Sequence, residues 1–256
     1  MGRFLSSLLL LPSNVKAMND VRGRLSMWNA ALWGGFAGSA VFIGALMGIF
    51  FKIPNRWIGI IMSFGTGVLV GAAAFELLLE SVKEGGLLAT SRGFIGGAML
   101  FTFAEFFISK RGGKERKRSK GNPKGSSGGL AIFIGTLLDA IPESMIIGVS
   151  LLETGKVSFL LVIAVFISNF PEGLSSSVGL KKGGYSNKKI LFLWLLVMIL
   201  SAISSLVGFV FLEDASKTII SIISAFAAGA VVSMVSAAMM PEAYDEGGPI
   251  FGLVTS

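Results

Sequence analysis

Long apolar stretches separated by short polar segments dominate this chain of 256 residues. About 20 mostly apolar residues are enough for a helix to cross the hydrocarbon core of a bilayer. Seven stretches meet or approach that length: 29–51, 57–75, 93–109, 128–152, 157–180, 190–212 and 218–240. A further apolar run, Pro249–Val254, resembles the first turns of an eighth helix, and we expect the native chain to continue past Ser256. The pattern predicts an all-α, polytopic membrane protein with seven complete transmembrane helices and the start of an eighth.

The composition agrees with this class and excludes several chemistries. Hydrophobic residues make up 53% of the chain and charged residues only 14%, whereas soluble domains carry roughly 25% charged residues. The chain has neither Cys nor His. Disulfides, thiolate catalysis, imidazole metal ligation and Ser-His-Asp triads are therefore excluded, and no sequence feature favours an enzyme.

Basic residues gather in the loops on one side of the predicted bundle. Segment 110–129 carries eight Lys and Arg residues against one Glu, and further basic residues follow the first and fifth spans. Lys and Arg in short loops stay on the cytoplasmic side. We therefore expect a multi-pass protein of the cell membrane with loop 110–129 in the cytoplasm and the N-terminus outside. The placement of the net charge of +7 is then explained by the membrane topology, and no nucleic-acid partner is expected.

The chain divides into an N-terminal segment, 1–28, and a transmembrane domain, 29–256. Arg3 and Leu8–Leu11 imitate a signal peptide, but the apolar run is short and no clear cleavage site follows. Arg22 and Arg24 would lie outside, against the charge rule. We expect the segment to be extramembrane or to reflect a start codon assigned too far upstream.

An internal repeat relates the second and seventh spans. A shift of 162 residues superimposes the ending Glu80-x-x-x-Glu84-Gly85-Gly86 on Glu242-x-x-x-Glu246-Gly247-Gly248. Five crossings separate the two spans, so they run in opposite directions. Inverted repeats of this kind are a recurring architecture of transporters.

A second repeat places acids in the middle of two adjacent spans. Pro142-Glu143 in the fourth span and Pro171-Glu172 in the fifth stand 29 residues apart. A carboxylate at membrane depth is costly unless it faces a partner or water. A Pro inside a helix removes one backbone hydrogen bond and kinks the helix. Two kinked helices with carboxylates predict an oxygen-rich pocket near the membrane midplane.

The helical spacing adds further oxygen ligands to this pocket. Asp139 lies one turn before Glu143, while Ser168 and Asn169 lie one turn before Glu172. Carboxylate, amide and hydroxyl oxygens on facing helices can surround one divalent ion. A protonated, hydrogen-bonded packing role for these acids is the alternative. Glu76, Glu80 and Glu105 are secondary candidates. For Glu76 and Glu80, a role as solvated acids at the end of a helix is an equal alternative.

These residues resemble the ZIP (Zrt/Irt-like) family of divalent-metal transporters in its bacterial branch. Segments 139–144 and 168–173 stand where that family has the Pro-Glu motifs of its fourth and fifth helices. Leu77–Ser81 and Met239–Ala243 resemble the endings of the family's second and seventh helices. The resemblance covers about Asn29 to Ser256 and implies a ZIP-like helix bundle with an inverted repeat.

The departures from the family pattern bear on the ion. Asp139 and Ser168 replace the two motif histidines, Ala140 replaces an Asn, and Ser204 stands near the place of a sixth-helix Glu. The resemblance implies Zn²⁺, whereas an all-oxygen site suits harder ions such as Mn²⁺. A two-metal centre is not expected.

The resemblance implies gradient-driven transport of divalent metal ions, with import toward the cytoplasm through Asp139, Glu143, Ser168, Asn169 and Glu172. No cofactor is implied, since the metal is the transported substrate. The partners expected are that ion and the bilayer, and a homodimer remains open. The competing hypothesis is a non-transporting scaffold or metal-responsive regulator on the same fold.

Overall fold

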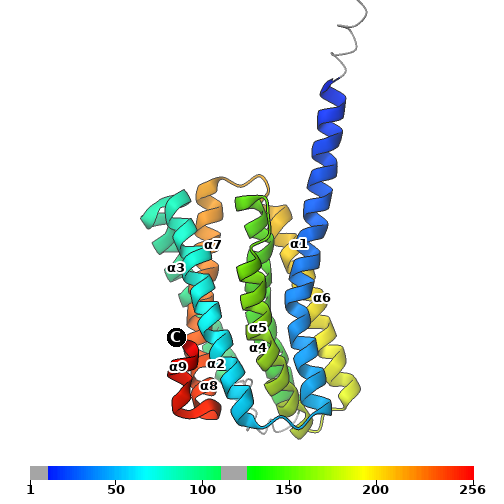
Figure 1. Cartoon of the computed structure of the whole chain (residues 1–256), viewed down its shortest axis with the longest axis vertical. Helices are drawn as coiled ribbons and strands as arrows, with labels where there is room; N and C mark the ends of the chain where they lie inside the picture. The colour runs from blue at the N-terminus through cyan, green and yellow to red at the C-terminus, as the bar shows by residue number, and fades with distance from the viewer. Residues whose placement is uncertain (1–10, 111–125) are drawn as a thin grey trace, which may run out of the picture.

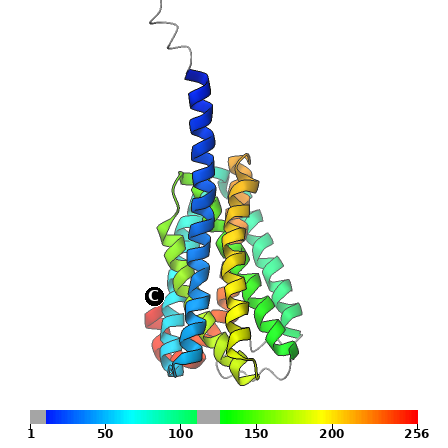
Figure 2. The ribbon, with the colours of Figure 1, turned by 90° about the vertical axis from the view of Figure 1, so that its right-hand side faces the viewer.

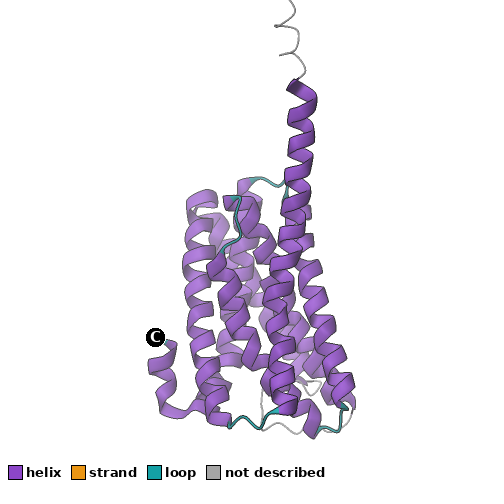
Figure 3. Cartoon of the chain, turned by 45° about the vertical axis from the view of Figure 1, so that its right-hand side comes forward, coloured by secondary structure: helices purple, strands orange, loops and turns teal. Residues whose placement is uncertain are grey.

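The computed structural model describes residues 11–110 and 126–256, and within these ranges it contains helices and no strands (Figure 3). The predicted basic loop 110–129 therefore lies largely outside the described residues. The helices are α1 (Leu11–Phe50), α2 (Asn55–Ala72), η2 (Ala73–Leu78), α3 (Leu79–Lys110), α4 (Ser126–Thr154), α5 (Phe159–Lys182), α6 (Asn187–Leu212), α7 (Lys217–Met234), η4 (Val235–Met239), α8 (Met240–Gly247), η5 (Gly248–Ile250) and α9 (Phe251–Thr255). The all-α prediction is confirmed.

Six helical stretches of the described chain are long and apolar enough to cross a membrane. One of them, Asn55–Phe107, is 53 residues long and contains both the second and the third predicted spans. The break between the two spans is Gly86, whose φ of 79° and ψ of 165° are not helical. This backbone region is open almost only to glycine. The chain reverses direction between α2 and the later part of α3 (Figure 1).

The connections sort to two ends of the bundle (Figure 1). The α1–α2 and α5–α6 connections lie at the lower end in that view, which we call the basic end because it holds Lys52, Lys181, Lys182, Lys188 and Lys189. The α4–α5 and α6–α7 connections lie at the opposite end. Helix α1 continues well past the bundle at that opposite end, as part of a single helix of 40 residues.

The helices pack as two units. In the first unit, α1 lies along α5 and α6, and α4 packs on α6 (Figure 2). In the second unit, α3 lies along α7, while α2 packs against α8 and α9. The units meet chiefly where α2 contacts α5.

Glycines allow the close approach of helices within the first unit. A Cβ at Gly44 of α1 would lie 2.1 Å from the carbonyl oxygen of Phe170, and one at Gly173 of α5 would lie 2.1 Å from that of Val41. Backbone contacts of this kind are how small residues support helix association inside a bilayer.

The repeat seen in the sequence is also a repeat of backbone structure. Helices α2 and α7 have 18 residues each, and each leads directly into a π-helical turn, η2 or η4. Gly86 and Gly248, which the shift superimposes, both have positive φ, 79° and 71°. The chain reverses direction between α2 and the later part of α3, and again between α8 and α9 (Figure 1).

The two halves of the repeat also make equivalent contacts between helices. A Cβ on Gly85 would meet Ser221 at 2.5 Å, and a Cβ on Gly59 would meet Gly247 at 2.2 Å. These two pairs superimpose on each other under the 162-residue shift. The α3–α7 pair and the α8–α2 pair are therefore equivalent parts of one inverted repeat.

Candidate metal site on α4 and α5

All five residues predicted to bind metal are buried. Their exposed fractions are 2% for Asp139, 2% for Glu143, 1% for Ser168, 1% for Asn169 and 3% for Glu172. They lie inside α4 and α5, two helices able to cross a membrane. Burying an ionised carboxylate is unfavourable unless a cation, a proton or hydrogen-bond donors compensate it. The sequence thus places unusually costly groups in the interior of the bundle.

Both helices contain a proline directly before the buried glutamate, Pro142 in α4 and Pro171 in α5. Pro171 has no N–H to donate to the carbonyl of Ile167, four residues earlier. That carbonyl oxygen faces α2, where it lies 3.1 Å from the position of a Cβ on Gly65. The glycine brings the α2 backbone up to the α5 segment that carries Ser168 and Asn169.

Local hydrogen bonds orient the polar side chains of α5. The Ser168 hydroxyl donates to the Val165 carbonyl at 3.0 Å, which leaves its oxygen lone pairs for another partner. The Ser176 hydroxyl donates to the carbonyl of Glu172 at 2.5 Å. The amide nitrogen of Asn169 is buried without a hydrogen-bond partner. Rotation of that amide by 180° puts its oxygen in the same place.

The described residues contain no cluster of three or more His, Cys, Asp or Glu side chains arranged to hold a metal ion. Asp139, Glu143 and Glu172 are thus buried on adjacent helices without forming a compact three-carboxylate cage. A site built from them uses the neutral oxygens of Ser168 and Asn169 as well. Within the first unit, α5 packs mainly on α1, and α4 packs mainly on α6.

One buried acid was not among the predicted ligands. Glu242 of α8 is 2% exposed, and one of its oxygens, Oε1, accepts a hydrogen bond of 2.8 Å from the Ser175 hydroxyl of α5. Its sequence signal is Pro241-Glu242, a third Pro-Glu pair beside the two in α4 and α5. In the sequence this pair indicates only the repeat and the family resemblance, whereas in the structure α8 brings Glu242 into contact with α5.

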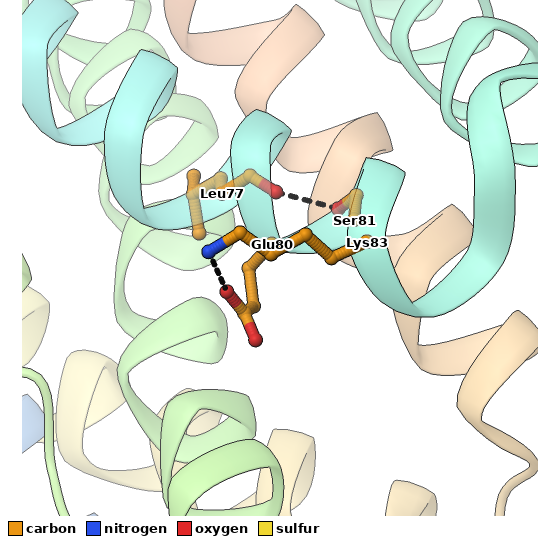
Figure 4. A network of polar contacts seen from close by, with 4 residues as sticks. All are labelled: Leu77, Glu80, Ser81 and Lys83. Carbon is orange, nitrogen blue, oxygen red and sulfur yellow. Dashed lines mark hydrogen bonds and ion pairs between the residues drawn. The ribbon is translucent and has the colours of Figure 1, made fainter.

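The acids at the opposite end have different surroundings. Glu80 pairs with Lys83 at 3.2 Å, while the Ser81 hydroxyl turns back to the Leu77 carbonyl (Figure 4). Glu84 pairs with Lys217 of α7 at 2.6 Å. A small pocket of about 70 Å³ lies here, lined by Glu80, Glu84, Leu152, Lys217, Ile220 and Ser221. Glu76 is held by the Ser158 hydroxyl at 2.7 Å.

Fold and site together define a polytopic helical membrane protein with an inverted repeat and with buried acids in two proline-containing helices, features typical of membrane carriers. The family model "ZIP Zinc transporter" matches residues 114–251, just over half of the chain. The chain belongs to this family of metal-ion transporters and not to an enzyme family.

A protein of Arabidopsis thaliana called "Putative zinc transporter At3g08650" is 26% identical over 238 residues. The match covers 91% of this chain and 38% of the relative. The chain therefore spans well under half the length of that relative.

Proposed function

We propose that this protein carries divalent metal ions across the cell membrane, driven by the ion gradient and directed toward the cytoplasm. The observation that carries the proposal is the burial of Asp139, Glu143 and Glu172 in α4 and α5, in a chain that belongs to a family of metal transporters. Buried like charges need a cation or protons to compensate them. A divalent ion meets that need and is at the same time the substrate.

The ligands we assign are Asp139, Glu143, Ser168, Asn169 and Glu172. Glu143 and Glu172 follow the two prolines and serve as the central ligands, since they bring the negative charge to the proline-containing segments. Asn169 and Ser168 contribute neutral oxygens that adjust affinity. Zn²⁺ is the ion that the family name favours, and the all-oxygen set extends the range to Mn²⁺ and Fe²⁺.

The division into two packing units supports a carrier mechanism in which one unit moves past the other. The first unit contains both helices of the proposed site. In the elevator-type relatives that the sequence resembles, the fourth and fifth helices likewise belong to the moving bundle. We propose that the basic end faces the cytoplasm, and we expect the same of the basic loop 110–129. A Cys introduced at Ser119 should then resist impermeant thiol reagents in intact cells, and labelling from outside would reverse the orientation.

Metal flux into proteoliposomes tests the site. Glu143→Gln keeps the shape of the side chain and removes its charge, so metal flux should fall at least tenfold. The protein should still fold, because the variant no longer has to bury a charged carboxylate at this position. The matched control is Glu213→Gln, which makes the same chemical change at an exposed position between α6 and α7. Wild-type flux in Glu143→Gln would remove this residue from the site.

A panel of ions sharpens the assignment of Asp139. Asp139→His restores an imidazole ligand and should shift preference from Mn²⁺ toward Zn²⁺. Uptake of Zn²⁺, Mn²⁺, Fe²⁺, Cd²⁺ and Mg²⁺ in a transport-deficient host measures that preference. An unchanged preference excludes Asp139 as a ligand. The absence of flux for every ion in the unmodified protein would favour the scaffold or metal-responsive regulator, which the loss of the family's histidines motivates.

A further inference from the structure

Two hydrogen bonds join α5 of the first unit to the second unit. Near the start of α5, the Ser158 hydroxyl donates to Glu76 Oε2 of η2 at 2.7 Å. Farther along α5, the Ser175 hydroxyl donates to Glu242 Oε1 of α8 at 2.8 Å. The two donors are 17 residues apart, about 25 Å along a helix. The proposed ligands from Ser168 to Glu172 lie between them.

The Ser158–Glu76 bond depends on the position of α5, because Ser158 is itself fixed to that helix. Its hydroxyl oxygen accepts from the Leu161 N–H at 3.3 Å, as the N-cap of α5. Its own N–H donates to the Ser150 hydroxyl at 3.2 Å, which ties it to the end of α4. The acceptor Glu76 lies in a π-helical turn, a feature often found at functional positions.

Between the two bonds, the backbones of α2 and α5 come close together at Gly65. At Gly65 there is no side chain, and the α5 backbone at Ile167 and Ser168 lies where a Cβ would be only 3.1 Å away. No side chain of α2 can interlock with α5 at that position. Hydrogen bonds to charged acceptors are among the stronger polar contacts, so these two are suited to hold one register.

We propose that Ser158 and Ser175 are positioning residues, whose bonds to Glu76 and Glu242 set the register of α5 against the second unit and break when the units slide. This inference rests on the proposed carrier function. It assigns to Glu76 the task of holding α5 in position, whereas the sequence alone made this acid a secondary candidate for the metal site.

The chain lacks cysteine, so a single introduced thiol reports local opening. Leu161 is 4% exposed and lies one turn inside α5 from Ser158. In a Leu161→Cys background, Glu76→Ala removes the acceptor and leaves the N-cap intact. Maleimide labelling in detergent micelles should become roughly tenfold faster, the size expected for losing a hydrogen bond to a charged group. Glu80→Ala makes the same change one turn further on, at an acid that pairs with Lys83, and should leave the rate unchanged.

A rescue separates the hydrogen bond from helix capping. Ser158→Asp keeps a good N-cap but places a carboxylate against Glu76, so labelling should accelerate as in Glu76→Ala. The double variant Ser158→Asp/Glu76→Gln restores a bond with the donor reversed, and labelling should return to within about twofold of the starting rate. Wild-type labelling in Glu76→Ala, or a double variant no slower than Ser158→Asp, overturns the inference.

Flux measured on the same variants keeps the two proposals apart. Labelling needs no transported ion, so the expected labelling pattern without any metal flux refutes the proposed function and supports only the part of the inference in which the Ser158–Glu76 bond holds α5 in register. Flux in the unmodified protein with unchanged labelling in Glu76→Ala refutes the register inference alone. Where both hold, Glu76→Ala should change the maximal rate of flux and leave its KM for metal within twofold, since Glu76 is not a proposed ligand.

Discussion

The two halves of the inverted repeat share a backbone and differ in what surrounds their acids. Glu80 and Glu242 superimpose under the 162-residue shift, and both follow a π-helical turn. Glu80 lies beside Lys83 with its side chain 33% exposed, whereas Glu242 is 2% exposed and bonded to α5. Equivalent positions in a repeat therefore have different chemistry, because the repeat determines the turn and the neighbouring unit determines the environment.

The largest expected effect tests the packing of the two halves. Gly229→Ala places a Cβ 2.0 Å from the Phe94 carbonyl oxygen, between the long helices α7 and α3. Neither backbone can move away easily, so we expect a loss of about 3 kcal/mol in the free energy of unfolding. Its repeat equivalent Gly67→Ala meets the Thr255 carbonyl oxygen at 2.2 Å. Because α9 is short, that variant should lose only about 1 kcal/mol.

Thermal unfolding in detergent compares these two variants with Gly71→Ala. Gly71 has no atom within 4 Å of its Cβ position, so alanine there should be neutral or stabilising through helix propensity. Equal losses in Gly229→Ala and Gly67→Ala would mean that α9 is held as firmly as α3.

The second prediction concerns the two reversals of the chain. Gly86→Ala and Gly248→Ala should each cost about 2 kcal/mol, because their backbone angles are strained for any residue with a Cβ. Neither glycine has an atom within 4 Å of its Cβ position, so the cost comes from φ and ψ alone. Similar shifts in unfolding temperature for both variants would support the structural equivalence of the two turns. Tolerance of alanine at one of the two positions would contradict it.

The third prediction concerns the acids themselves. Glu242→Gln should reduce metal flux about tenfold, because it removes a buried charge that faces the first unit. Glu80→Gln should change flux less than twofold, since an exposed ion pair contributes little. Flux in proteoliposomes at matched protein insertion measures both. An equal loss in the two variants would make the acids functionally equivalent despite their different surroundings.

The smallest effect is expected at Lys217. Its ion pair with Glu84 is short, but the Lys217 side chain is 77% exposed, and exposed ion pairs contribute little to stability. Lys217→Met should leave the unfolding temperature unchanged within error. A clear loss of stability would indicate that the pair fastens α3 to α7 more firmly than its exposure suggests.

The fold class could be predicted from the sequence because each apolar span carries its own length and hydrophobicity. The repeat could be predicted too, since Glu84-Gly85-Gly86 and Glu246-Gly247-Gly248 retain the same residues. The ligand positions stay a prediction: the structure buries all five residues, and burial alone does not identify a metal ligand. The role of Glu242 was missed because its partner, Ser175, is 67 residues away in sequence.

What the sequence by itself determined is local: which segments cross the membrane, where prolines interrupt them, and where glycines let the chain reverse. Each of these follows from side-chain hydrophobicity or from backbone angles within a few residues. The tertiary structure alone decided which of the repeated acids is buried, and that Ser158 and Ser175 bond across to Glu76 and Glu242. Those pairings depend on how α2, α5 and α8 pack, because contacts between distant segments are set by the shapes of whole helices.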